Sequence, residues 1–276
     1  MNLTLGFSPC PNDTFIFDAW VNGSLQSTPA VTPVLADVEK LNEWSIDAKL
    51  DITKLSYPAL FRHLHEYRLL QAGSALGFGV GPLLISNKPI APNHADLTNK
   101  TVLLPGRSTT ANLLFTYAYP QIQLKSYRVF SEIEDTLLQG EADLGVIIHE
   151  NRFTYAQRGL HLVKDLGAHW EEKTGCAIPL GCIAIKRSLG EETAQLATTA
   201  IRQSLEHAWN ELPAISDYVK DHAQTMEPTV MRQHIDLYVN EHTMHLTPTD
   251  LEAIETLYKI YKRIEGIEST ETPLFF

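Results

Sequence analysis

The sequence predicts an α/β fold of two lobes with a cleft between them. Three apolar, strand-like runs in the first half of the chain, at 3–7, 50–52 and 101–104, each give way to polar residues that can begin a helix. A proline-containing connection at 88–93 separates two series of such elements. Alternating strands and helices predict mostly parallel sheets, and ligands bind where the carboxyl ends of the strands meet. With 276 residues, the chain can bury the cores of two small lobes.

The first lobe begins with a βα unit. A strand at 3–7 is followed by a helix at 14–21, with Asn12 or Asp13 as its N-cap and Gly23 at its end. The elements expected next are a strand at 31–38, a helix at 39–49, a strand at 50–53, a helix beginning at 56–58, and a glycine-rich segment at 77–81 that leads into a strand. Because these glycines precede a strand, they favour a hinge bend or a close backbone approach over a dinucleotide site.

The second lobe repeats the pattern from residue 97 onward. The expected elements are a strand at 102–104, a helix at 111–119, a strand at 125–129, a helix at 133–139 and a strand at 143–148. One more strand at 182–185 precedes a helical region, which ends in a long amphipathic helix from Thr247. We expect these helices to return to the first lobe. Residues 1–88 and 179–276 are therefore assigned to lobe I, and residues 89–178 to lobe II.

Composition and charge exclude several classes of protein. The formal charge is −11 and no basic cluster is present, which argues against a nucleic-acid partner. No run approaches the roughly 20 apolar residues that span a bilayer, and the start of the chain has no secretory leader pattern, so we expect no membrane partner. Cys10, Cys176 and Cys182 form an odd set without a CxxC motif, so neither disulfides nor a zinc site is expected. A cytoplasmic location fits these features best.

The polar residues at the strand ends form a candidate ligand site. Asn12, Ser56, 108–110 and His149 all follow predicted strands, and helix N-termini there can hold a carboxylate. Capping of the helices explains Asn12, Ser56 and Thr109 equally well, at about 1 kcal/mol each. Segment 107–110 carries more donors than a cap requires, which favours ligand contact for Thr109 and Thr110. Local cations such as Lys54 and Arg107 can offset the negative net charge.

His149 is the candidate general base. It emerges directly from the predicted strand at 143–148, with Glu150 beside it, and histidine titrates near neutral pH. A core histidine with ordinary hydrogen bonds is the alternative. The pairs His63/His65 and His242/His245 lack the spacing of a zinc enzyme, so no metal site is expected. Cys10, flanked by two prolines, is expected to be a packing group rather than a nucleophile.

Two motifs resemble one enzyme family. They are SPCPNDTFIF at 8–17 and GEADLGVIIHE at 140–150, and the similarity extends to GRSTTAN at 106–112, PLG at 179–181 and YVNE at 238–241. Together they resemble the 1,4-dihydroxy-6-naphthoate synthase family of the futalosine route to menaquinone. The resemblance implies a type II periplasmic-binding-protein-like fold that serves as an intracellular enzyme.

The resemblance also implies an activity and a set of residues. The activity is a carbon–carbon lyase reaction that converts cyclic dehypoxanthinyl futalosine into 1,4-dihydroxy-6-naphthoate and dihydroxyacetone, without cofactor or metal. His149 is the implied proton acceptor. The implied substrate-binding residues are Lys54, Leu55, Ser56, Thr109 and Thr110, and the strand-end argument adds Asn12, Asp13 and Ser108.

Two alternatives stay open at this point. A chorismate dehydratase-like enzyme of the same pathway would share the fold and also take a carboxylate substrate, although the motif at 8–17 argues against it. A cytoplasmic carboxylate-binding sensor module would close on its ligand without chemistry. The sequence leaves the oligomeric state, the extent of lobe closure and the first proton removed undecided.

Overall fold

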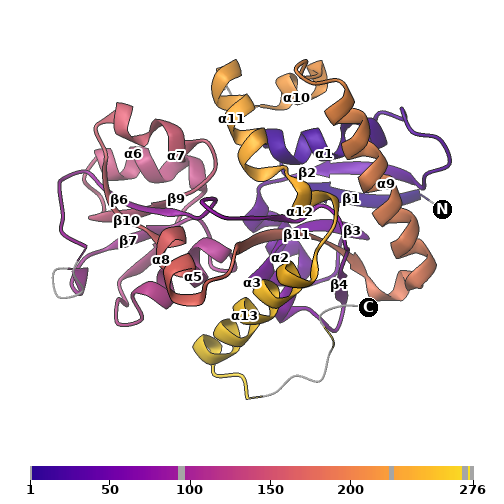
Figure 1. The fold of residues 1–276 in the computed structure, drawn as a ribbon. Coiled ribbons are helices and arrows are strands. Elements are labelled where there is room, and N and C mark those ends of the chain that lie inside the picture. The colour runs from indigo at the N-terminus through magenta and orange to yellow at the C-terminus, as the bar shows by residue number, and fades with distance from the viewer. Residues whose placement is uncertain (1, 93–96, 224–226, 269–272, 274–276) are drawn as a thin grey trace.

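The chain folds into two lobes, each built around its own sheet (Figure 1). The computed structural model describes residues 2–92, 97–223, 227–268 and 273. The first lobe contains the N-terminal strands together with the later helices, and the second lobe holds the middle of the chain. The predicted α/β fold of two lobes is confirmed.

The first sheet has six strands in the order β2-β1-β3-β11-β4, with β5 also paired to β11. The strands are β1 (Asn2–Phe7), β2 (Ala30–Leu35), β3 (Ile52–Ser56), β4 (Tyr67–Leu69), β5 (Ala75–Gly77) and β11 (Ile178–Lys186). β1 is parallel to β2 and β3, as expected for consecutive βα units. β11 is antiparallel to its three neighbours because it enters the sheet on the return from the second lobe.

The second sheet has five strands in the order β10-β6-β9-β7-β8. They are β6 (Leu83–Ser86), β7 (Val102–Leu104), β8 (Lys125–Tyr127), β9 (Leu144–Ile147) and β10 (His161–Asp165). β7 is parallel to β8 and β9, whereas β6 is antiparallel to both β9 and β10. Both sheets are therefore mixed, and the expectation of mostly parallel sheets is wrong at the strands next to the chain crossings.

The lobe boundary expected at residue 88 is also wrong, by one strand. β6 pairs in the second sheet, so the chain crosses between the lobes after β5 and before Leu83. The glycine-rich segment makes this crossing: a Cβ on Gly81 would lie 2.3 Å from the Cα of Gly167. Only glycine allows the two backbones to approach so closely. The chain returns to the first sheet at the start of β11.

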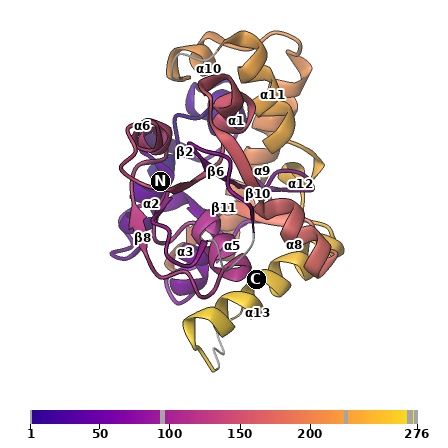
Figure 2. The same cartoon turned by 90° about the vertical axis from the view of Figure 1, so that its left-hand side faces the viewer.

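Helices cover both sheets. In the first lobe they are α1 (Pro11–Val21), α2 (Val38–Ser45), α3 (Tyr57–Arg62), α9 (Gly190–Asn210), α10 (Asp217–His222), α11 (Pro228–Tyr238), α12 (Glu241–Met244) and α13 (Pro248–Glu265). In the second lobe they are α5 (Thr110–Ala118), α6 (Ile133–Leu138), α7 (Asn151–Thr154) and α8 (Leu166–Thr174), with short 3₁₀ turns at η1 (Phe130–Glu132) and η2 (Tyr155–Arg158). A third 3₁₀ turn, η3 (Arg187–Leu189), follows β11 in the first lobe. Viewed toward the second lobe, α11 lies above and α13 below (Figure 2).

The hydrophobic clusters fill the lobes, and one of them also connects the two lobes. α1 packs on α9 over the first sheet, in a cluster that includes Phe7, Phe17 and Ile201. A larger cluster contains side chains of both lobes, among them Leu55 and Leu104. α13 contacts α3 and β11 as well as α5 of the second lobe. No helix among the described residues is long and apolar enough to cross a membrane.

Candidate functional site

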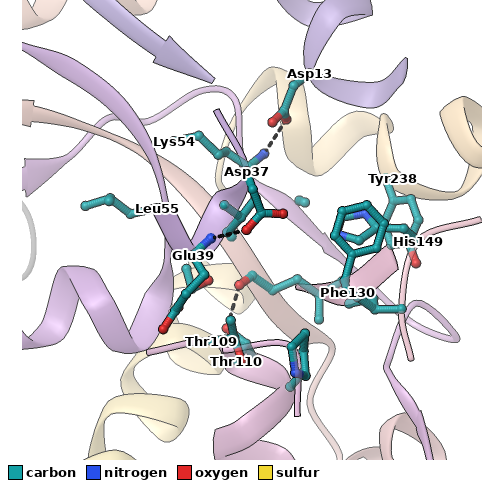
Figure 3. Close-up of a pocket in the computed structure, with 18 of the residues that line it drawn as sticks. Asp13, Asp37, Glu39, Lys54, Leu55, Thr109, Thr110, Phe130, His149 and Tyr238 are labelled. Atoms are coloured by element: carbon teal, nitrogen blue, oxygen red, sulfur yellow. Dashed lines mark hydrogen bonds and ion pairs between the residues drawn. The ribbon is translucent and has the colours of Figure 1, made fainter. Parts of the chain in front are cut away.

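A cavity of about 690 Å³, including its open mouth, lies between the lobes. The strand-to-helix junctions of the first lobe face the start of α5, η1 and the end of β9 across it (Figure 3). The site residues predicted from the sequence that line this cavity are Asn12, Asp13, Lys54, Leu55, Ser56, Thr109, Thr110 and His149. Ser108 is not among the lining residues. Every site residue predicted from the strand ends therefore lines this cavity, except Ser108.

Lys54 is not a free cation. Its Nζ lies 2.8 Å from Oδ1 of Asp13, and both side chains are almost fully buried. Asn12 Nδ2 donates to the same carboxylate oxygen, while the N–H and hydroxyl of Ser8 donate to the other. Removing one partner of such a pair typically costs about 3–5 kcal/mol because the other charge stays buried alone. The ion pair therefore fixes the floor of the cavity and does not attract an anion by itself.

Asp13 lies in the first turn of α1, not at its N-cap. The N-cap is Cys10, which makes no side-chain capping bond, so the expectation of Asn12 or Asp13 in that position is wrong. Pro11 occupies the first helical position, where its missing N–H costs nothing. The Cys10 thiol is buried, which raises its pKa, and all three cysteines are free. A thiol held in its neutral form is a packing group rather than a nucleophile.

The hydroxyls of Thr109 and Thr110 are both used within the protein. Thr109 Oγ1 donates to the carbonyl of Gly106 and accepts from the N–H of Asn112, which makes Thr109 the N-cap of α5. Thr110 Oγ1 donates to the carbonyl of Leu180 at 2.5 Å. Neither hydroxyl has a proton left for a ligand. What α5 offers the cavity is its first backbone N–H groups, which have no partner within the helix.

A carboxylate of the protein already occupies the loop before α5. Glu39, on α2 of the first lobe, accepts hydrogen bonds from the N–H groups of Arg107 and Ser108 at 2.7 and 3.2 Å. Asn42 donates to its second oxygen. A Cβ on Gly106 would lie 2.4 Å from the Glu39 carboxyl carbon, so only glycine allows this approach. The N–H of Ser108 therefore serves Glu39, and the expectation that Ser108 binds the substrate stays a prediction.

The side chain of Arg107 does not line the cavity. Its guanidinium lies over the ring of Tyr127, 4.6 Å from the centroid. Asp37 does line it and caps α2 through a hydrogen bond from the N–H of Glu39. Burial raises the pKa of both Asp37 and Glu39. Among the described residues that line the cavity, three are carboxylates and one is a lysine, so a ligand carboxylate there would depend on backbone N–H groups. Asp37 can accept hydrogen bonds from ligand hydroxyls.

His149 lies at the wall of the cavity in an unusual backbone conformation. It follows β9 with φ of 62°, a left-handed conformation that residues other than glycine adopt rarely and that costs about 1–3 kcal/mol. Its ring packs against Phe130, with centroids 5.1 Å apart, and against His234, with centroids 5.7 Å apart and planes within 4°. Burial lowers the pKa of His149 to about 4. The imidazole is therefore neutral at pH 7 and has a lone pair that can take a proton.

Several lining residues were missed by the sequence analysis. Asp37 follows the end of β2 and therefore obeys the same strand-end rule as Asn12 and Ser56, so the signal was present. Phe130 and Tyr238 give no such signal. Tyr238 lies on α11 of the first lobe and reaches the cavity only through the packing of that helix against α1.

The fold defines the class of protein first. Two mixed sheets, two chain crossings and a cavity between the lobes form a type II periplasmic-binding-protein-like fold. The alkanesulfonate-binding protein of Xanthomonas axonopodis pv. citri has this fold, with a TM-score of 0.71 and 14% identity over 97% of this chain and 94% of that one. A protein from Archaeoglobus fulgidus is more similar, with a TM-score of 0.89 and 28% identity over 96% and 98% of the two chains.

The sequence then identifies the family. Residues 3–263 match the family described as "Menaquinone biosynthesis". The 1,4-dihydroxy-6-naphtoate synthase of Thermus thermophilus is 41% identical over 93% of this chain and 92% of its own length. The synthase of Streptomyces coelicolor is also 41% identical, over 92% and 91%. The chain belongs to this menaquinone-biosynthesis family, and the resemblance seen in its motifs is confirmed.

Proposed function

We propose that the protein is a carbon–carbon lyase that converts cyclic dehypoxanthinyl futalosine into 1,4-dihydroxy-6-naphthoate and dihydroxyacetone, with His149 as the general base. Membership of the family supports the product, since both curated relatives carry the name of that synthase. The observation that carries the role of His149 is its position: a neutral imidazole at the wall of the interlobe cavity, on a backbone conformation that the fold must hold.

The chemistry follows from these groups. His149 takes a proton from the substrate, the ring opens, and formation of the aromatic naphthoate drives release of the three-carbon fragment. A positioned general base contributes about 10² to 10⁴ in rate. Enclosure between the lobes supplies orientation, which can contribute as much again.

The substrate carboxylate is expected at the start of α5. Among the described residues, the N–H groups of Thr110 and Ala111 make no hydrogen bond, and both residues line the cavity. Unpaired N–H groups and the positive end of the helix dipole suit a carboxylate. Asp37, on the opposite wall, is expected to accept from the hydroxyls of the sugar-derived part. Lys54, Leu55 and Ser56 contact the substrate from β3 in this arrangement.

The test is conversion of cyclic dehypoxanthinyl futalosine by purified protein in buffer containing EDTA, followed by chromatography with mass detection. We expect the wild type to form 1,4-dihydroxy-6-naphthoate, and His149→Ala to lower kcat at least about 10²-fold while substrate affinity stays within a few fold. The exposed His161 provides the control: His161→Ala should match the wild type. Equal rates for wild type and His149→Ala would remove His149 from the reaction.

The same assay separates the alternatives. Binding of the substrate without product would favour a carboxylate-binding sensor module. Turnover of chorismate in place of the futalosine derivative would identify a chorismate dehydratase-like enzyme. Either outcome would contradict the proposed reaction while leaving the family assignment intact.

A further inference from the structure

Behind His149, three buried polar atoms meet without a hydrogen-bond partner among the described residues. They belong to His149, Glu150 and His234, and one ring nitrogen or carboxylate oxygen of each lies within 4.8 Å of the other two. Nδ1 of His149, Oε2 of Glu150 and Nδ1 of His234 are all buried without a hydrogen-bond partner among the described residues. Leaving a buried polar atom unpaired typically costs about 1–3 kcal/mol. Three such atoms in one place call for a functional explanation.

The state of His234 is fixed by its other nitrogen. Its Nε2 lies 2.8 Å from Oδ1 of Asn12, an oxygen that can only accept, so Nε2 carries the proton. Asn12 is held in this orientation because its Nδ2 donates to Asp13. Burial lowers the pKa of His234, so Nδ1 presents a lone pair, 3.8 Å from Oε2 of Glu150. Two acceptors thus face each other until a proton arrives between them.

The same three atoms have the spacing of possible metal ligands. Tetrahedral zinc at about 2.1 Å from its ligands sets the ligand atoms about 3.4 Å apart, close to the 3.8 Å between the His234 and Glu150 atoms. Zinc binding is therefore the alternative that the experiments must separate from a proton.

We propose that Glu150 and His234 are positioning residues that stabilise the proton His149 removes from the substrate, with Glu150 as the counter-charge of the imidazolium. The proposal rests on the proposed role of His149 as base. The proton moves from the substrate to a ring nitrogen of His149, which becomes cationic, and no other bond changes at this step. A buried imidazole is a weak base unless its cationic form finds a partner, because desolvation opposes the charge. The Glu150 carboxylate supplies that partner, as the carboxylate does behind the histidine of a Ser-His-Asp triad.

Glu150 acts from behind rather than on the substrate. A second cavity of about 570 Å³ is lined by Glu150 and by the Cys10 loop, and it shares Asp37, Val38, Phe130 and His149 with the substrate cavity. Glu150 lines the second cavity only, whereas His149, its neighbour in the chain, lines both. We therefore expect the effect of Glu150 on the substrate to pass through His149.

The pH dependence can be worked out from the surroundings of Glu150. The titratable and charged groups near it are His149, His234, Cys10, Tyr238, Arg152 and Glu134. Burial raises the pKa of Glu150, and the charge of Glu134 raises it further. As the pH falls through this raised pKa, Glu150 becomes neutral and the imidazolium loses its counter-charge. We expect kcat to fall on the acid side at a pH above the ordinary range of glutamate.

The test is Glu150→Gln, which keeps the shape and removes the charge. We expect kcat to fall about 10²-fold with KM within about two-fold, and the acid limb assigned to Glu150 to disappear from the pH profile. Glu150→Asp should recover part of kcat and keep an acid limb. The control is Glu134→Gln, another buried carboxylate close by: plateau kcat should stay within about two-fold, and the acid limb should move to lower pH. A lowered kcat with an unchanged acid limb in Glu150→Gln would reduce Glu150 to a structural role and overturn the proposal.

A measurement without substrate tests the role of Glu150 independently of the proposed function. In protein labelled with ¹⁵N-histidine, the ring signals of His149 and His234 should shift with pH in a step that Glu150→Gln removes. This step is expected even if the futalosine derivative is not the substrate. Identical histidine titrations in both proteins would overturn the proposal, as would stoichiometric Zn²⁺ binding that Glu150→Gln abolishes, because the three residues would then be metal ligands.

Discussion

Burial decides what single residues in this cavity can do. Lys54 forms an ion pair with Asp13, 2.8 Å away, and that pairing prevents either group from serving as a free ion. His149 has no such partner in the cavity and is neutral, since burial lowers its pKa to about 4. The two buried residues thus differ: one is held in a structural ion pair, and the other is held as a neutral imidazole by desolvation. The difference lies in the neighbours rather than in the residue types.

The lowered pKa of His149 predicts that the protein loses stability in mild acid. The folded-state pKa lies below the unfolded value of about 6.5, so between these values the unfolded chain binds more protons and stability falls as the pH falls. Between pH 6.5 and 5 the contribution is roughly 2 kcal/mol. In urea unfolding, the wild type should lose free energy of unfolding between pH 7 and pH 5. His149→Gln should lose less, by roughly 2 kcal/mol.

The exposed His161 gives the matched control for this experiment. His161→Gln should lose as much stability between pH 7 and pH 5 as the wild type does. If His149→Gln behaved in the same way as His161→Gln, the neutral state assigned to His149 would be wrong, and with it the main reason for its role as base.

At the scale of elements, the threonine hydroxyls at the start of α5 already have hydrogen-bond partners within the protein. Thr109 caps α5, so Thr109→Val should lower the free energy of unfolding by about 1 kcal/mol through loss of the bond to the Asn112 N–H. Because its hydroxyl proton already goes to Gly106, substrate affinity should change less than about three-fold. Thermal unfolding and substrate titration measure the two effects. Thr109→Ser should restore stability, whereas a ten-fold loss of affinity at unchanged stability would show that the hydroxyl contacts the ligand.

Local sequence signals predicted most elements but not their long-range pairings. The strands at 3–7 and 102–104 are short apolar runs with clear ends, and both were found. β10 was missed because most of its side chains are exposed or half-exposed, which leaves no apolar pattern. The direction of β11 depends on where the chain returns from the second lobe, and no residue of β11 encodes that path. The site follows the same division: His149 could be predicted from its strand end, while the bond of Asn12 to His234 joins residues 222 positions apart.

At the scale of the whole molecule, three features hold the lobes together across the cavity. One hydrophobic cluster includes side chains of both lobes, and α13 contacts α5 as well as α3. The third feature is polar: Glu39 of the first lobe receives hydrogen bonds from the loop before α5 of the second. Apolar contacts are largely insensitive to the ligand, whereas Glu39 sits beside the N–H groups at which we expect the substrate carboxylate. We therefore expect Glu39 to couple ligand binding to closure of the lobes.

Removing the Glu39 carboxylate should open the protein in the absence of substrate. Glu39→Ala deletes two hydrogen bonds to a charged acceptor, each worth about 1.5–3 kcal/mol, which is enough to shift an equilibrium between closed and open lobes strongly. Small-angle X-ray scattering should then give a larger radius of gyration than for the wild type, and saturating substrate should reduce the difference. Glu43→Ala, on the exposed face of the same helix, is the control and should scatter like the wild type. If Glu39→Ala also scattered like the wild type, the apolar cluster and α13 would be sufficient to keep the lobes closed, and the carboxylate would serve only to order the loop before α5.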